Sequence, residues 1–206
     1  MRPTAFRTNM HSLVRQLVFV RHGITAPQEQ RRYCGHLDPE LSVRGKEQVE
    51  RARERFLHLQ PAYVWSSDLR RCTETASMLC PGMTYTTLPE FREISFGNFE
   101  NRCYSEFSSE INNILLDPDA SFPDGESLRA LSSRVRIGLT KVLAHSSETV
   151  VVVAHAGSIA AAALALLNLP LGSFWSFHLP HGGSAVFEGR EESWVEACAD
   201  WKRPED

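Results

Sequence analysis

The chain lacks several features that would narrow its class at once. Its 206 residues include only five cysteines, none of them in a Cys-x-x-Cys pair or at a Cys/His spacing that suggests zinc. The net charge of -3 gives no overall attraction to nucleic acid or to an anionic membrane, so attraction to an anion must be local. No apolar run reaches the length of a membrane span. The longest, 159–169, is rich in alanine and leucine and ends at Pro170, which is typical of a buried helix.

The cysteines and the ends of the chain bear on where the protein works. An odd, modest number of scattered cysteines fits reduced thiols, and we expect a cytoplasmic protein. Residues 1–15 carry three arginines and no acidic group, which faintly resembles an organelle transit peptide. We expect a disordered extension over 1–15 rather than a transit peptide, and a translation start at Met10 would explain the composition equally. Residues 199–206 are expected to form a loose tail.

Alternating strand and helix patterns predict the fold. With 42% hydrophobic residues the chain can build one core, so we expect a single domain over 16–198. Helices are expected after Ser42, over 69–79 and after Ser127, and strand-like segments at 16–20, 62–66, 84–88, 149–154, 173–179, 184–188 and 193–198. This order predicts a three-layer α/β/α fold with a mostly parallel central sheet. The irregular, aromatic-rich stretch 91–125 is expected to be an insertion that covers the site.

Two apolar runs end in a histidine that glycine soon follows. Leu17–Val20 leads into Arg21-His22-Gly23, and Val150–Ala154 leads into His155-Ala156-Gly157. Each run is typical of a buried strand, and ligands of open α/β sheets bind where the strands end. Two histidines at that edge, with an arginine beside one of them, indicate chemistry on a phosphate.

Five short motifs carry a family resemblance when they are taken together. They are Arg21-His22-Gly23-Ile24-Thr25, Leu41-Ser42-Val43-Arg44-Gly45, the segment 66–76, Glu93-Ile94-Ser95-Phe96-Gly97 and Ala154-His155-Ala156-Gly157. Each alone is weak, but in this order they resemble the histidine phosphatase superfamily, with its phosphoglycerate-mutase-like fold. The resemblance spans roughly residues 16–190. It implies a phosphoric monoester hydrolase that needs no metal or cofactor and acts on a small-molecule phosphate ester through a phosphohistidine intermediate.

The resemblance assigns the nucleophile to His22. A neutral imidazole can attack phosphorus and form a covalent intermediate that water cleaves, provided that a hydrogen bond holds its other nitrogen. Arg21 and Arg71 are the implied phosphate ligands, because a guanidinium stays charged and grips phosphate oxygens in a fork. Arg70 competes with Arg71 by proximity, but adjacent helical residues point about 100° apart, and Arg70 is expected at the surface.

The resemblance also assigns an acid and a second histidine. His155 would donate to a phosphate oxygen in the transition state, although such a histidine can equally cap a strand end. Glu93 matches the proton donor to the leaving oxygen, and the plainer interpretation is an ion pair with Arg92 or another arginine. The other implied substrate contacts are Thr25, Gln28, Gly35 and Ala156.

Four further positions need a separate interpretation. Ile24 stands where the family commonly has Glu or Gln, and Gln28 where it commonly has Asn. Because Ile24 cannot form a side-chain hydrogen bond, a contact to the non-phosphate part of the substrate is expected to be lost. His181 lies in a glycine-rich segment that often reaches the site in this family, and a plain turn fits it equally well. Cys72 is expected to be a small buried helix residue, with a catalytic thiol as the alternative.

Within the phosphatases, two stretches resemble the α-ribazole phosphatase branch of cobalamin assembly. They are Tyr33-Cys34-Gly35-His36 and the segment 91–102. The candidate substrate is therefore α-ribazole 5′-phosphate, whose flat benzimidazole could stack on aromatic side chains. The same side chains could equally form a small core of the insertion: Phe96, Phe99, Tyr104 and Phe107.

Three other functions stay open. Mutases share this pocket, although those for which the fold is named carry a longer insertion and tail than 206 residues provide. A protein phosphatase would favour a shallow, open site. A non-catalytic phosphate-binding module would not need both a nucleophile and an acid.

The chain could also form a homodimer, because the strands near the C-terminus are expected to be exposed. Nucleic-acid and membrane partners are not expected.

Overall fold

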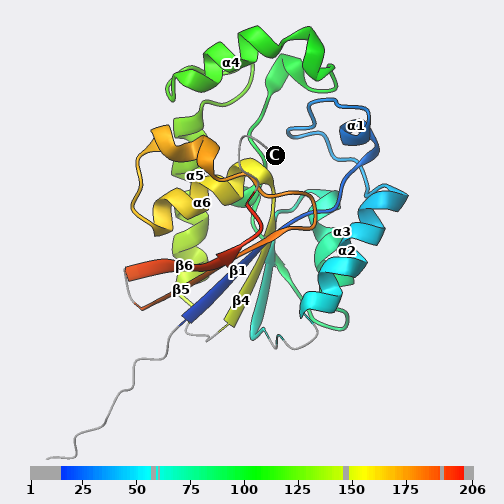
Figure 1. Cartoon of the computed structure of the whole chain (residues 1–206), viewed down its shortest axis with the longest axis vertical. Coiled ribbons are helices and arrows are strands. Elements are labelled where there is room, and N and C mark those ends of the chain that lie inside the picture. The colour runs from blue at the N-terminus through cyan, green and yellow to red at the C-terminus, as the bar shows by residue number, and fades with distance from the viewer. Residues whose placement is uncertain (1–14, 57–58, 60, 146–148, 191–192, 202–206) are drawn as a thin grey trace, which may run out of the picture.

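A six-stranded sheet with the order β3-β2-β4-β1-β5-β6 lies at the centre of the protein (Figure 1). The computed structural model describes residues 15–56, 59, 61–145, 149–190 and 193–201. Its strands are β1 (Arg15–Arg21), β2 (Tyr63–Ser66), β3 (Thr86–Thr87), β4 (Thr149–Ala154), β5 (Ser184–Arg190) and β6 (Ser193–Ala199). The first four strands pair in parallel, whereas β5 runs antiparallel to both β1 and β6. The mostly parallel sheet that the sequence predicts is confirmed.

Helices cover both faces of this sheet. Helices α2 (Val43–Phe56) and α3 (Arg70–Leu79) lie on one side, and α5 (Leu128–Leu143) and α6 (Ala156–Leu166) lie on the other (Figure 1). This arrangement confirms the three-layer architecture. The remaining helices are short: α1 (Ala26–Glu29), α4 (Ser108–Leu116), and the 3₁₀-helices η1 (Pro89–Phe91), η2 (Gly97–Phe99), η3 (Tyr104–Glu106) and η4 (Leu171–Ser176).

The two central strands are apolar because both of their faces are buried. In β1, Leu17 and Phe19 join one core cluster, whereas Val18 and Val20 join the cluster on the opposite face. Strand β4 alternates in the same way along 150–153. Parallel strands covered on both faces carry continuous apolar runs, which explains the two runs that precede the histidines.

Two expected segments differ in the structure. The segment 173–179, expected to be strand-like, includes most of η4, where Phe174 is buried and packs in the core instead of pairing with a strand. The stretch 91–125, expected to be irregular, contains α4, which buries Ile111. This helix ends at Leu116, because Pro118 keeps Asp117 in an extended conformation.

Both ends of the described part differ from the sequence expectation. Arg15, placed in the predicted extension, is the first residue of β1, and residues 1–14 lie outside the described residues. Ala199, expected in the loose tail, is instead the last residue of β6. The carboxylate of Asp200 accepts from the backbone N–H of Ser184 at 2.8 Å and pairs with Arg55 at 2.8 Å. Residues 202–206 lie outside the described part.

Within the described ranges, none of the helices has the length and apolar character that a membrane crossing requires. All five cysteines lie in the described part and carry free thiols. Strand β6 forms one edge of the sheet. The cytoplasmic location and the homodimer stay predictions.

The cap of α5 gives a direct test of this local structure. The hydroxyl oxygen of Ser127 accepts from the backbone N–H of Ala130 at 3.1 Å. Ser127→Ala should lower the free energy of unfolding by about 1 kcal/mol. Ser127→Asp should keep the free energy of unfolding close to that of the wild type, because aspartate caps helices equally well. Urea unfolding followed by circular dichroism measures both. An alanine variant as stable as the wild type would contradict a stabilising cap.

Candidate active site

His22 lies one residue beyond the end of β1. Its backbone N–H donates to the carbonyl oxygen of Ala154 at 3.1 Å, which ties it to the end of β4. The ring is buried, and its Nδ1 lies 2.6 Å from the carbonyl oxygen of Gly23. Because a carbonyl only accepts, Nδ1 carries the proton and Nε2 carries the lone pair. This is the partner that the sequence could not identify.

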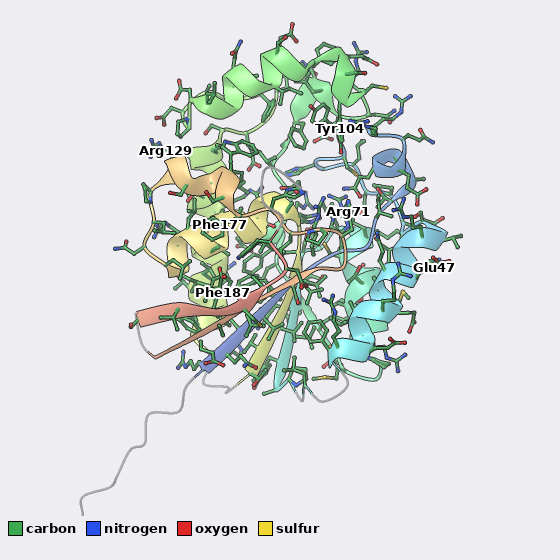
Figure 2. The ribbon with its side chains drawn as sticks, viewed as in Figure 1. Glu47, Arg71, Tyr104, Arg129, Phe177 and Phe187 are labelled. Atoms are coloured by element: carbon green, nitrogen blue, oxygen red, sulfur yellow. The ribbon has the colours of Figure 1, made fainter. Side chains whose placement is uncertain are left out.

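Arg71, on α3, joins the two histidines at the strand ends. Its Nε lies 3.3 Å from Nε2 of His22 and 3.2 Å from Nδ1 of His155. Its other two nitrogens donate to the carbonyl oxygens of Leu37 and Gly35, at 2.6 and 2.8 Å. Gly35 has a φ of 48°, which glycine adopts without strain. The side chain is fully buried near the middle of the molecule (Figure 2), so a permanent positive charge lies beside both imidazoles.

His155 is held on its other side by a hydroxyl and a thiol. Its Nε2 lies 2.9 Å from Oγ of Ser67 and 3.3 Å from Sγ of Cys72. Because Nδ1 accepts from Arg71, Nε2 carries the proton in this arrangement and Ser67 accepts it. Cys72 is fully buried in α3, and burial raises the pKa of its thiol. A buried helix residue, as expected from the sequence, describes Cys72 better than a catalytic thiol.

Arg21 adds a second positive charge near His22, and the ring of His181 lies between the two residues. Nη1 of Arg21 donates to the carbonyl oxygen of Leu179 at 2.5 Å, and Nη2 lies 3.1 Å from Nε2 of His181. Nδ1 of His181 lies 3.2 Å from the carbonyl oxygen of His22, so His181 accepts from one neighbour and donates to the other. The buried Nε of Arg21 has no hydrogen-bond partner among the described residues. Of the two interpretations of His181, the structure supports the one that brings it to the site.

Burial and the arginines keep these imidazoles neutral. Burial, and then the charge of Arg71, hold the pKa values of His22 and His155 well below their usual range. Burial, and then Arg21, lower the pKa of His181 to about 2. Burial also lowers the pKa of Arg21, to about 10, which leaves its guanidinium charged at neutral pH. Neutral imidazoles beside charged guanidiniums suit a nitrogen nucleophile and a phosphate dianion.

Glu93 lies at the N-terminus of α6. Its two carboxylate oxygens accept from the backbone N–H of Gly157 at 3.1 and 3.2 Å, and Oε1 also accepts from that of Ile94 at 2.9 Å. A Cβ at position 157 would collide with this carboxylate, so the close approach requires glycine. In the described part of the chain Arg92 pairs with Asp68 rather than with Glu93.

Arg134, on α5, holds the backbone of Glu93 in place. Its guanidinium donates to the carbonyl oxygens of Arg92 and Glu93, both at 2.7 Å, and pairs with Glu126 at 2.7 Å. Nε2 of His36 lies 2.8 Å from the same carbonyl of Glu93. No sequence motif pointed to Arg134, because its role depends on how α5 packs against this segment.

A cavity of about 250 Å³ adjoins this centre. Five of the expected site residues line it: Arg21, Gln28, Gly35, Glu93 and Ala156. His22, Arg71 and His155 are fully buried beside these lining residues. Thr25 is also fully buried, and its hydroxyl donates to Oε1 of Gln28 at 3.0 Å. Thr25 therefore orients Gln28 in this structure, and its expected contact with the substrate stays a prediction.

Aromatic side chains form much of the remaining wall. Phe96 and Tyr104 line the cavity, whereas Phe99 and Phe107 pack together with ring centroids 4.8 Å apart, as part of the core. In the view of Figure 2, Tyr104 lies above Arg71, and Phe177 lies to the left of Arg71. The sequence interpretation missed three wall residues in and after η4, because that segment was expected to be a strand: Phe174, Trp175 and Phe177.

Two other sequence positions lie outside the described wall. Arg70 pairs at the surface with Glu40 and Glu74, as expected. Ile24 contributes its backbone, since its N–H donates to Oε1 of Gln48 at 2.9 Å and its carbonyl accepts from Ser42.

Across the residues that the structure describes, no group of three or more His, Cys, Asp and Glu side chains is placed to hold a metal ion.

Comparison with known proteins decides the family. Residues 17–201 match the histidine phosphatase superfamily (branch 1). The chain belongs to this superfamily. It is an enzyme of the phosphoric monoester hydrolase class, and the family and fold expected from the five motifs are confirmed.

Three similar proteins illustrate the range within the family. Phosphoglycerate mutase-like protein 4 of Arabidopsis thaliana is 35% identical over 155 residues, which cover 70% of this chain and 67% of the relative. Phosphoserine phosphatase 1 of Hydrogenobacter thermophilus is 30% identical over 184 residues, covering 85% and 87%. A solved structure of mycobacterial glucosyl-3-phosphoglycerate phosphatase superposes with a TM-score of 0.83 at 28% identity, covering 91% of this chain and 100% of that one.

The contact between Gly157 and Glu93 gives a first test of the site. Gly157→Ala should displace the carboxylate and reduce kcat/KM by about 10²-fold, because small misplacements of reacting groups are costly. The fold should hold, since alanine favours a helix. Gly172→Ala is the control, because a Cβ there meets nothing within 4 Å. Full activity in the Gly157 variant, measured by phosphate release, would contradict the role of this contact.

The neutral histidines predict a pH dependence of stability. His22, His155 and His181 have lowered pKa values in the folded state, so the unfolded chain binds more protons below pH 6.5. The free energy of unfolding should be highest above pH 6.5. Below pH 6.5 it should decrease, by at most about 1.4 kcal/mol per pH unit for each histidine. Urea midpoints between pH 7.5 and 5.5 measure this slope, and His181→Gln should make it shallower. A midpoint constant over that range would refute the buried neutral state.

Proposed function

We propose that the enzyme hydrolyses a small-molecule phosphate monoester through a phosphohistidine on His22, without a metal ion or other cofactor. The observation that carries the proposal is the 2.6 Å contact between Nδ1 of His22 and the carbonyl oxygen of Gly23. This hydrogen bond leaves the lone pair on Nε2, the nitrogen next to Arg71. Membership of the superfamily supports the same chemistry.

The first step is attack by Nε2 of His22 on phosphorus, in line with the ester oxygen. The N–P bond forms while the P–O bond to the alcohol breaks. Arg71 must release Nε2 for this step. A phosphoryl oxygen is the stronger acceptor for a guanidinium, so substrate binding would turn the Nε–H of Arg71 towards the phosphate. The buried Nε–H of Arg21, which has no partner among the residues described, is a second donor for the same group.

Glu93 moves the protons in both steps. As an acid it gives its proton to the leaving alcohol oxygen, and as a carboxylate it then takes a proton from water. The oxygen of that water cleaves the N–P bond, which releases inorganic phosphate and restores His22. The place of Glu93 in the cavity wall supports both transfers.

His155 donates to the phosphate only after its own proton changes nitrogen. Its Nδ1 accepts from Arg71 in this structure, so donation requires a proton on Nδ1 and a donor to Nε2. The hydroxyl of Ser67, 2.9 Å from Nε2, can either donate or accept. Ser67 therefore supports both tautomers of His155 and acts as a positioning residue.

The candidate substrate is α-ribazole 5′-phosphate, which would place the enzyme in cobalamin assembly. Phe96 and Tyr104 support this choice, because they line the cavity and could contact a flat benzimidazole. Relatives named for phosphoserine and for glucosyl-3-phosphoglycerate act on other small esters. Another relative is named mutase-like, so transfer of the phosphoryl group to a second position remains the alternative activity.

Phosphate release from α-ribazole 5′-phosphate and 3-phosphoglycerate in a metal chelator tests the proposal. We expect fast release from the ribazole ester with and without chelator, and a loss of at least about a thousandfold in His22→Ala, which removes the nucleophile. Activity that the chelator abolishes would contradict metal independence. Activity that survives in the variant would place the nucleophile elsewhere, and formation of 2-phosphoglycerate would indicate a mutase.

Glu93→Gln separates proton transfer from binding. For an alkyl phosphate the variant should form the phosphoenzyme about 10²- to 10⁴-fold more slowly, because the leaving alkoxide needs a proton. 4-Nitrophenyl phosphate should be much less affected, since its leaving group departs as an anion. Rapid-quench bursts measure both rates, and vanadate inhibition checks that the phosphate subsite is retained. An equal loss with both esters would show that Glu93 is not the acid for the leaving group.

A further inference from the structure

The cavity beside the catalytic centre points to a narrower substrate class. We infer that the enzyme prefers phosphate esters of uncharged alcohols that carry a flat, apolar group, and that it discriminates against esters with a carboxylate. The inference rests on the proposed function, because it concerns the part of the substrate that leaves as the alcohol.

The charges available in the wall are few. Besides a thiol and two phenols, the ionisable side chains among the described lining residues are Arg21, Glu93 and His178. Arg21 belongs to the phosphate centre, and its Nη1 lies 3.5 Å from Nε2 of His178. Because the guanidinium only donates, that nitrogen of His178 accepts from it. Neither side chain provides a cation set apart for a carboxylate in the leaving group.

The thiol and the phenols of the wall add no charge at neutral pH. Burial raises the pKa values of Tyr33, Cys34 and Tyr104 above their usual values. The nearby Arg31 is exposed and is not among the described lining residues, although its carbonyl accepts from the backbone N–H of Tyr104. Glu93 is thus the one carboxyl group of the described wall, and it offers no positive charge to a carboxylate in the substrate.

Apart from the uncharged amide of Gln28 and the small residues at 35, 156 and 157, the rest of the wall is apolar and aromatic. Side chains from the 91–128 stretch and from the segment around η4 line the cavity, among them Ile94, Phe96, Ile111, Leu128, Phe174 and Phe177. A carboxylate placed there would lose its water without gaining a cationic partner, which is unfavourable. A flat, apolar group would bury surface against the same side chains and gain ring contacts.

The names of two relatives imply substrates that this cavity wall does not favour. Phosphoserine and glucosyl-3-phosphoglycerate each carry a carboxylate near the phosphate, and relatives named for them share 30% and 31% identity with this chain. A shared phosphate centre does not require a shared subsite for the alcohol. The side chains that distinguish substrates lie in the wall, away from His22 and Arg71.

Trp175 offers a way to change this selectivity without disturbing the catalytic centre. It lines the cavity, yet half of its surface is exposed, so a polar side chain can replace it without burying a charge. Trp175→Lys adds a cation at the cavity wall. Trp175→Met has a side chain of similar length without charge and serves as the matched control.

The test compares two esters that differ only in charge: 4-(carbamoylmethyl)phenyl phosphate and 4-(carboxymethyl)phenyl phosphate. The methylene group keeps the two leaving phenols electronically alike. For the wild type we expect kcat/KM to be at least about tenfold higher for the amide, because the carboxylate is desolvated without a partner. Trp175→Lys should reduce this ratio severalfold, and Trp175→Met should leave it unchanged.

The outcomes separate the inference from the proposed function. Equal kcat/KM values for the two esters, both dependent on His22, would overturn the inference and leave the phosphohistidine mechanism standing. A preference for the carboxylate ester would also overturn it. Hydrolysis that His22→Ala does not affect would remove the proposed function itself.

Discussion

The buried guanidinium of Arg71 is the interaction on which the site depends. Its Nε contacts both strand-end histidines, and its other nitrogens fix the carbonyl oxygens of Leu37 and Gly35. One side chain thus ties α3, the turn at 35–37 and two strands of the sheet to a common point. A buried cation of this kind persists only when its donors are satisfied, and here backbone carbonyls and imidazole lone pairs satisfy them.

The sheet brings the histidines to that point. Strands β1 and β4 are parallel neighbours with Arg21 opposite Ala154, so the residues that follow, His22 and His155, leave the sheet at the same edge. Burial and the arginine charges then keep both rings neutral. The same charges that disfavour an imidazolium favour a phosphate dianion, so the environment that keeps the nucleophile neutral also binds the substrate.

The sequence predicts the parts of this site that depend on strand ends and short motifs. His22 and His155 follow strands whose apolar runs are visible in the chain, and Arg71 lies in the first turn of a helix that the pattern also predicts. Contacts made across the fold are not visible in this way. Arg134 holds Glu93 from α5, and Ser67 holds His155 from the end of β2. The aromatic side chains around η4 were missed because they pack as a 3₁₀ turn against the core and the cavity, although their spacing resembles a strand.

The most direct test of the account locates the phosphoryl group during turnover. The enzyme is mixed with an excess of a phosphate ester and stopped in alkali within milliseconds, because alkali preserves phosphohistidine. Mass spectrometry of the peptides then identifies the residue, and phosphorus NMR identifies the nitrogen. We expect the phosphoryl group on Nε2 of His22, since Nδ1 is occupied by its bond to Gly23. Phosphorylation of Nδ1, of His155 or of no histidine would contradict it.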